Sequence, residues 1–229
     1  MEIIPVIDVM GGKLVHARGG KRADYLPLTS LLTECDAPIE VIKDLLAYHP
    51  FSTFYIADLD AIMSNQRDGD LYSDLSNIFP NTVFYLDAGI SDMESWQALA
   101  IYPNIYPVIG SETLLDILWL SDLAVRTKSI LSLDFQYGKF LGDVLLLSSP
   151  NLWPERVIAM NLDCVGSQRG PDLHLLADLK TMSTSSIIAA GGVRNEQDLM
   201  ELQQRGTEQV LIASALHDGR INKRFLETI

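Results

Sequence analysis

Short apolar runs alternate with stretches of helical periodicity along the chain, and this alternation limits the folds open to it. The runs expected to be strands are Ile3–Ile7, Thr53–Ala57, Thr82–Leu86, Tyr106–Ile109, Ser129–Leu133, Val157–Met160, Ser186–Ala189 and Gln209–Ile212. The expected helices are Pro38–Tyr48, Leu71–Ile78, Asp92–Ala100, Leu114–Val125, Leu173–Thr181, Asn195–Gln204 and Lys223–Ile229, with a short helix near Pro150–Arg156. Because parallel strands need a long crossover connection, the alternation predicts a parallel sheet. Eight such units close naturally into a (β/α)₈ TIM barrel of the α/β class.

The two halves of the chain resemble each other in their motifs. Similar motifs recur 103 positions apart, at Asp60 and Asp163, Gly89 and Gly192, and Gly110-Ser111 and Ala213-Ser214. The motif Asp-x-x-x-Gly-Lys also occurs twice, from Asp8 and from Asp134. An internal repeat of this kind predicts two similar half-barrels, joined in one domain that covers residues 1–229.

The composition restricts the partners more than the ligand. The formal net charge is −13, and the 17 lysines and arginines do not cluster as nucleic-acid binding requires. The apolar runs fall far short of the ~20 residues that span a bilayer, and the N-terminus lacks the features of a secretory signal. We therefore expect no nucleic acid and no membrane as partner, and a cytoplasmic location. Cys35 and Cys164 match no metal-binding or disulfide spacing.

Asp8 and Asp134 each end an apolar run, and the carboxyl ends of barrel strands form the rim that carries active sites. Isolated aspartates and glycines at such positions are usually helix caps or turn formers. Here the aspartate recurs on the first strand of each half, which favours a catalytic pair on opposite walls of the barrel. Two such carboxyl groups can donate one proton and remove another in a single pocket.

These motifs resemble those of the HisA/HisF family of histidine biosynthesis. The likeness covers essentially the whole chain, in "MEIIPVIDVMGGKLV", "ADLDAI", "LSLDFQYGK", "LDCVGSQRGPDL", "IIAAGGVRNEQDL" and "VLIASALHDGRI". The resemblance implies a (β/α)₈ barrel and, for the isomerases of the family, an Amadori rearrangement of an aminoaldose to an aminoketose. It also implies that neither a metal nor an organic cofactor takes part.

The resemblance implies roles for particular residues as well. Asp8 would be the general base and Asp134 the general acid, which near neutrality requires a raised pKa. The family's substrate is a small phosphorylated sugar with a phosphate at each end, gripped by glycine turns in the two halves. The implied phosphate- and substrate-binding positions are Gly89, Gly110, Ser111, Asp163, Gly166, Arg169, Gly191, Gly192, Ala213 and Ser214.

Three departures from the family pattern point to a changed substrate. The chain has Asp87 and Ser91 in "DAGIS", where the isomerases usually carry Gly-Gly-Gly-Ile-Arg, so the phosphate site of the N-terminal half should be weaker. Met160-Asn161 replaces the usual Thr-Asp, and the loop after the fifth strand is short. The alternative substrate is another phosphorylated compound, of the kind used in the biosynthesis of methanopterin- or methanofuran-type one-carbon cofactors.

Other residues and functions stay open at this point. His16, Arg18, Lys21 and Arg22 lie in a long first loop and suit either a cationic lid or a solvated loop. Besides an isomerase, the chain could be a HisF-like cyclase or synthase that takes ammonia from a glutaminase partner. A barrel that only binds a phosphorylated ligand is disfavoured, because two carboxylates facing an anion would not help it. The sequence does not indicate the oligomeric state.

Overall fold

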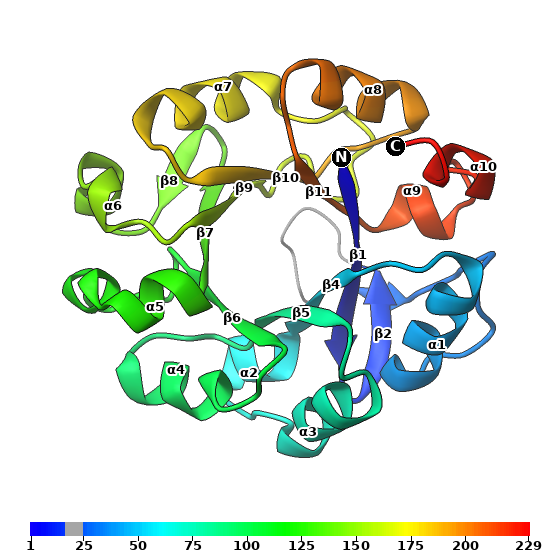
Figure 1. The fold of residues 1–229 in the computed structure, drawn as a ribbon, viewed down its shortest axis with the longest axis horizontal. Coiled ribbons are helices and arrows are strands. Elements are labelled where there is room, and N and C mark those ends of the chain that lie inside the picture. Colours follow the sequence, from blue (N-terminus) through cyan, green and yellow to red (C-terminus); the bar gives the residue numbers. More distant parts are fainter. Residues whose placement is uncertain (17–24) are drawn as a thin grey trace.

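Eight parallel strands close into a barrel in the computed structural model, which describes residues 1–16 and 25–229. The barrel strands are β1 (Glu2–Met10), β4 (Thr53–Asp58), β5 (Val83–Asp87), β6 (Ile105–Gly110), β7 (Ile130–Gln136), β9 (Arg156–Asn161), β10 (Ser186–Ala190) and β11 (Gln209–Ile212). They are hydrogen-bonded in this order, and β11 pairs back onto β1, where Pro5 lies opposite Ile212. Helices surround the strands (Figure 1). The predicted (β/α)₈ barrel is confirmed.

Most predicted helices are also present. The helices are α1 (Pro38–Tyr48), α2 (Leu59–Ser64), α3 (Gly69–Ile78), α4 (Met93–Ala100), α5 (Leu123–Lys128), α6 (Val144–Ser148), α7 (Leu173–Met182), α8 (Glu196–Gln204), α9 (Ser214–His217) and α10 (Lys223–Leu226). The single helix expected over Leu114–Val125 is wrong: a 3₁₀ helix at Leu118–Ser121 is followed by α5. The break occurs because the Asp122 side chain accepts a hydrogen bond from Ala124 N–H and starts a new helix.

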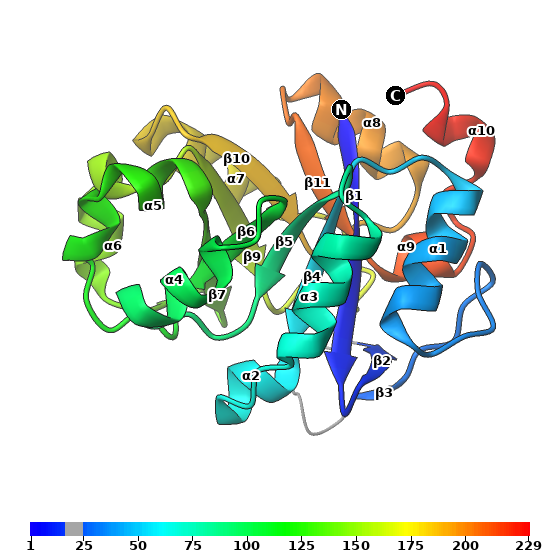
Figure 2. The ribbon, with the colours of Figure 1, turned by 60° about the horizontal axis from the view of Figure 1, so that its bottom comes forward.

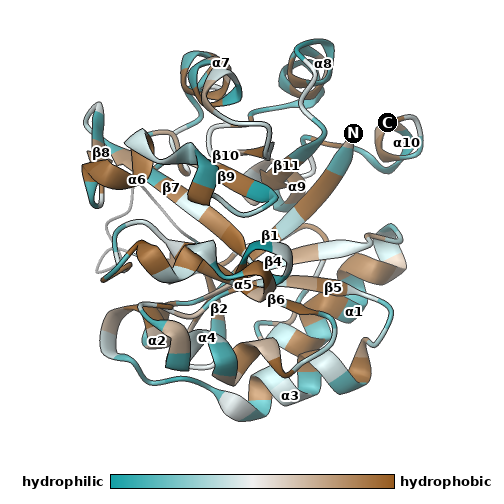
Figure 3. Cartoon of the chain, turned by 60° about the vertical axis from the view of Figure 1, so that its left-hand side comes forward, coloured by the Kyte–Doolittle hydropathy of each residue, from teal (hydrophilic) through white to brown (hydrophobic). Residues whose placement is uncertain are grey.

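The core has two parts, one inside the barrel and one between the strands and the helices. On β4, Phe54 and Ile56 face the helices, whereas Tyr55 and Ala57 face the barrel interior. This is the period of two that a strand imposes on its side chains. In Figure 3, helices α7 and α8 carry both hydrophobic and hydrophilic residues, as helices that cover a barrel should.

The repeated Asp-x-x-x-Gly-Lys motif builds a β-hairpin in each half. Strand β1 continues past Asp8 and turns into β2 (Lys13–His16), and β7 continues past Asp134 and turns into β8 (Lys139–Leu141). Both turns have two central residues with positive φ, Gly11-Gly12 at 59° and 73° and Tyr137-Gly138 at 52° and 68°. Such two-residue turns match the twist of the flanking strands. A short third strand, β3 (Leu26–Pro27), extends the first hairpin at the carboxyl end of β1 (Figure 2).

The two halves share one strand register. Asp87 on β5 lies opposite Ala57 on one side and Val108 on the other. Ala190 on β10 lies opposite Met160 and Leu211, which are the residues 103 positions further along. The predicted half-barrel repeat is therefore present in the ladders, and residues of one half can be compared directly with those of the other. The prediction of a single domain stays a prediction.

Candidate active site

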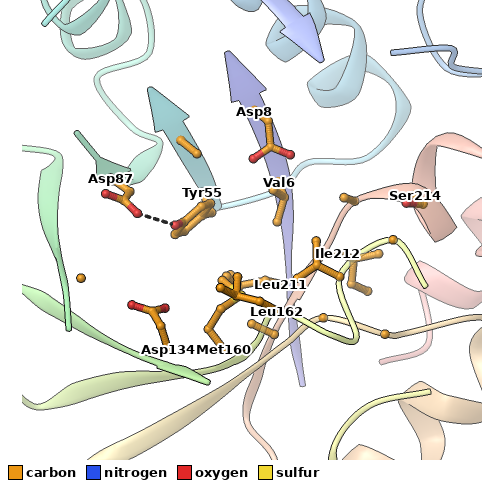
Figure 4. A pocket seen from close by; sticks show the side chains of 18 of the residues that line it. Val6, Asp8, Tyr55, Asp87, Asp134, Met160, Leu162, Leu211, Ile212 and Ser214 are labelled. Atoms are coloured by element: carbon orange, nitrogen blue, oxygen red, sulfur yellow. Dashed lines mark hydrogen bonds between the residues drawn. The ribbon is translucent and has the colours of Figure 1, made fainter. Parts of the chain in front are cut away.

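A cavity opens at the carboxyl end of the barrel and is lined by residues of both halves. Asp8 on β1 and Asp134 on β7 both line it, and they approach it from opposite sides (Figure 4). This is the placement that the sequence predicted for the two carboxyl groups. Their catalytic roles stay a prediction.

The Asp134 carboxyl group is the most constrained group of the cavity. It is 8% exposed, Ser132 Oγ donates to its Oδ1 at 2.7 Å, and Ser111 Oγ lies 3.2 Å from its Oδ2. Burial raises the pKa of Asp134 to about 7; the charges of Asp87 and Glu112 act in the same direction, and the two serine hydroxyls oppose them. At neutral pH the group is therefore present in both its acid and its base form.

Tyr55 lines the cavity in contact with the Asp87 carboxylate, and sequence reasoning missed it. Its hydroxyl donates to Asp87 Oδ2 at 3.1 Å (Figure 4). Burial raises the pKa of Tyr55 well above its ordinary value, and the charges of Asp87, Asp134 and Asp8 add to the effect, so the phenol stays protonated. The available signal was its inward position on β4, where a large aromatic residue must fill the barrel or end at its mouth.

In the C-terminal half, Gly191 and Gly192 line the cavity with φ of 87° and 84°. A Cβ on Gly192 would lie 2.1 Å from the carbonyl oxygen of Gly170, so a side chain there is excluded. Ala213 and Ser214 line the cavity beside them. Small residues at all four positions let a ligand approach the backbone.

His16 and Arg220 are two further polar residues on this side of the site. Ser214 Oγ lies 3.1 Å from Nε2 of His16, which brings the end of β2 to the start of α9. Arg220 lines the cavity and is held by hydrogen bonds to the Arg194 carbonyl (3.0 Å) and to Asp218 Oδ2 (2.6 Å). Arg220 carries a positive charge to the wall; it lies within the stretch "VLIASALHDGRI", but no binding role was predicted for it. The proposed lid residues Arg18, Lys21 and Arg22 lie outside the described residues.

Gly89 and Ser111, in the N-terminal half, do not line the cavity, although Gly110 does. A Cβ on Gly89 would lie 3.0 Å from Cα of Ile62, so Gly89 allows β5 to pack closely against α2. Ser111 is buried, and its hydroxyl oxygen lies 2.6 Å from the carbonyl oxygen of Leu141 on β8. Ser111 thus contacts both the hairpin and Asp134.

The remaining predicted positions lie around the sixth strand of the barrel, β9. Gly166 lines the cavity, while Arg169 is exposed and stands outside the lining. The Asp163 carboxylate accepts a hydrogen bond of 2.6 Å from the backbone N–H of Tyr137, and Asp60 accepts one of 2.6 Å from Gly11. Both aspartates therefore hold a hairpin turn.

The described part of the chain holds neither a cluster of metal ligands nor a membrane-spanning helix. In residues 1–16 and 25–229, no group of three or more His, Cys, Asp or Glu residues is arranged to hold a metal ion. Across the same residues, no helix has the length and apolarity needed to cross a membrane.

The chain is similar to several known proteins. The model of a family described as "Histidine biosynthesis protein" matches residues 2–222. An uncharacterized protein of Methanocaldococcus jannaschii is 31% identical, over 96% of this chain and 94% of its own. Two imidazole-4-carboxamide isomerases, named for a compound with two phosphoribosyl groups, are each 25% identical. They come from Myxococcus xanthus, with 97% and 96% of the two chains covered, and from Gemmatimonas aurantiaca, with 99% and 98%. The names of these relatives agree with the isomerase class expected from the sequence and leave the reaction open.

Proposed function

The chain belongs to the histidine biosynthesis protein family, and from that premise we propose that it is a phosphosugar isomerase that converts an aminoaldose to an aminoketose. The observation that carries the proposal is the pair of carboxyl groups that face one cavity from β1 and β7. One of them, Asp134, has a pKa of about 7. A general acid works best when its pKa lies near the working pH.

In the proposed reaction, the Asp134 proton goes to the ring oxygen of the aminoaldose. The bond from that oxygen to C1 breaks, and the substrate opens to an iminium ion. The Asp8 carboxylate removes the proton from C2, whose electron pair forms the C1–C2 double bond of an enolamine. When the enolamine collapses, C1 takes the proton held by Asp8, and the hydroxyl proton at C2 returns to Asp134. Both carboxyl groups regain their starting forms, and the product is the aminoketose.

The surroundings of Asp134 suit this cycle. Ser132 and Ser111 hold the carboxyl group in place, which keeps its proton directed at one point of the cavity. The charges of Asp87 and Glu112 raise its pKa and so favour the protonated form that begins the reaction. Without the two serine hydroxyls the pKa would be higher still, and the proton would leave less readily.

A phosphate of the substrate would bind in the C-terminal half, at Gly191, Gly192, Ala213 and Ser214. Backbone N–H groups can approach a phosphate where the residues are small, and successive N–H groups at a glycine turn form a concave anion site. Arg220 adds a positive charge to the same wall. These features support a phosphorylated substrate rather than a neutral sugar.

The substrate of this chain need not be that of the named isomerases. The uncharacterized relative, at 31% identity, is more similar to the chain than the two isomerases, at 25%. Asp87 and Met160 also line the cavity at positions where the sequence departs from the isomerase pattern. We therefore keep, as a second candidate, the same chemistry on a different phosphorylated substrate, of the kind used in one-carbon cofactor biosynthesis.

Complementation of a histidine auxotroph that lacks the isomerase tests the first candidate. Growth that depends on Asp8 and Asp134 would establish the histidine-pathway reaction. Without growth, the purified protein is screened against phosphorylated aminoaldoses, with the Asp8→Asn protein as control. Turnover of any such compound that survives Asp8→Asn unchanged would refute paired-carboxylate catalysis.

A further inference from the structure

The two halves of the barrel differ in charge at positions that their shared register makes equivalent. Asp87 in the N-terminal half corresponds to Ala190 in the C-terminal half, and both line the cavity. Tyr55 corresponds to Ile158, and Glu112 to Ala215, each 103 positions further along. A chain built from two similar halves could offer two similar anion sites. This chain places carboxylates in one half where it has alanines in the other.

The backbone donors of the N-terminal half are also engaged. The N–H of Gly89 donates to Asp87 Oδ1 at 3.3 Å, and the N–H of Ser111 donates to the Ser132 carbonyl at 2.9 Å. These residues are the equivalents of Gly192 and Ser214, which line the cavity in the other half. A phosphate in the N-terminal half would therefore have to break internal hydrogen bonds to obtain the same donors.

Gly110, also in the N-terminal half, does line the cavity, but it offers no better place for a phosphate. A Cβ on Gly110 would lie 3.7 Å from Asp134 Oδ2, so a phosphate over Gly110 would press against that carboxyl group. After burial, the charges of Asp87 and Glu112 are further causes of the raised pKa of Asp134, so this wall is already rich in negative charge. Adding a dianion to the same wall is unfavourable.

We infer that Asp87 is a specificity-determining residue, which restricts the cavity to substrates with a single phosphate, held by the C-terminal half. The other end of the substrate is then uncharged or cationic, and it lies beside Asp87 and Tyr55. This inference rests on the proposed function, since it assumes a phosphate at Gly191 and Gly192. It departs from the isomerases among the relatives, whose name includes two phosphoribosyl groups.

Calorimetric titration with two matched sugars tests the inference through binding alone. Ribulose 5-phosphate and ribulose 1,5-bisphosphate share one carbon skeleton and differ by one phosphate. We expect the unaltered protein to bind the bisphosphate no more tightly than the monophosphate. Asp87→Ala, which copies Ala190, should improve bisphosphate binding at least tenfold relative to the monophosphate. Asp87→Asn keeps the size of the side chain and should give a smaller gain in the same direction.

The matched control is Ala190→Asp, which places a carboxylate at the equivalent position of the other half. It should weaken the binding of both sugars at least tenfold. The inference is overturned if the unaltered protein prefers the bisphosphate tenfold, or if neither Asp87 variant changes the ratio while its circular dichroism is native. Failure of the unaltered protein to bind either sugar also overturns it. The isomerase proposal is judged separately, by turnover and its dependence on Asp8.

Discussion

The carboxylate of Asp163 accepts a hydrogen bond from the backbone N–H of Tyr137 at 2.6 Å. This bond ties the turn between β7 and β8 to the end of β9, next to the strand that carries Asp134. Tyr137 has φ of 52°, a conformation that side chains other than glycine adopt at a cost, so the turn needs external support. Asp163 thus helps to position a proposed catalytic strand without lining the cavity.

Asp163→Ala should therefore lower stability. A hydrogen bond to a charged group typically contributes about 1.5–3 kcal/mol, and the partial exposure of Asp163 places the loss near the lower value. The free energy of unfolding in urea measures it. Asp178→Ala on the exposed side of α7 is the control and should change stability by less than about 0.5 kcal/mol. Equal midpoints for the two variants would contradict a structural role for Asp163.

Asp8→Asn and Asp134→Asn should each remove most turnover of the true substrate. Each amide keeps the shape of the side chain but cannot exchange the required proton, and loss of a positioned acid or base costs roughly 10²–10⁴ in rate. Steady-state kinetics and phosphate titration, run side by side, measure the effect. Phosphate affinity should stay within about threefold, because neither carboxyl group is among the residues proposed to hold the phosphate. A loss of phosphate binding in the Asp134 variant would instead indicate a general disruption of the cavity.

The rate should depend on the protonation of Asp134. With a pKa of about 7, kcat/KM should fall as the pH rises through that value, because the acid form is lost. The hydrogen bond from Ser132 stabilises the carboxylate and lowers this pKa. Ser132→Ala should therefore move the alkaline limb to higher pH, which a profile from pH 5 to 9 would reveal. A limb that stays in place, or moves to lower pH, is incompatible with Asp134 as the titrating acid.

Asp134 should also make the unaltered protein less stable at alkaline pH. Its folded pKa of about 7 exceeds the ordinary value of 3.8, so the folded state binds more protons between these values. The contribution of Asp134 to the free energy of unfolding is fully present below about pH 4 and is lost as the pH rises to about 7. Asp134→Asn lacks this loss, which amounts to about 4 kcal/mol at most. The melting temperature of Asp134→Asn minus that of the unaltered protein should therefore be larger at pH 8 than at pH 4. A smaller difference at pH 8 would contradict the raised pKa.

The strands were predictable because they are short, apolar and separated by helical stretches of ordinary length. The hairpins were not predicted, although Gly11-Gly12 between two apolar runs is a known hairpin signal. Tyr137-Gly138 forms the same turn but gives no such signal, since tyrosine rarely adopts positive φ. The predicted helix over 114–125 was wrong because apolar periodicity outweighed the capping tendency of Asp122.

Two cavity residues were not predicted from the sequence, and for the same reason. Tyr55 and Arg220 reach the cavity through the closure of the barrel, so local patterns give no reason to place them together. Asp8 and Asp134 could be predicted because the internal repeat marks equivalent strand ends. Sequence reasoning therefore works best here where the two halves agree, and it fails where a side chain acts through distant neighbours.

The pairing of β1 with β11 sets an order of events during synthesis. Residues Glu2 to Pro5 are made long before their partners Gln209 to Ile212. Until then one edge of β1 carries unpaired backbone groups, and such edges readily pair with other chains. Contacts so distant in sequence also form slowly. The newly made barrel is thus most exposed to aggregation just before β11 arrives, whereas a circular permutant that begins near β11 would bring the two strands together at the outset.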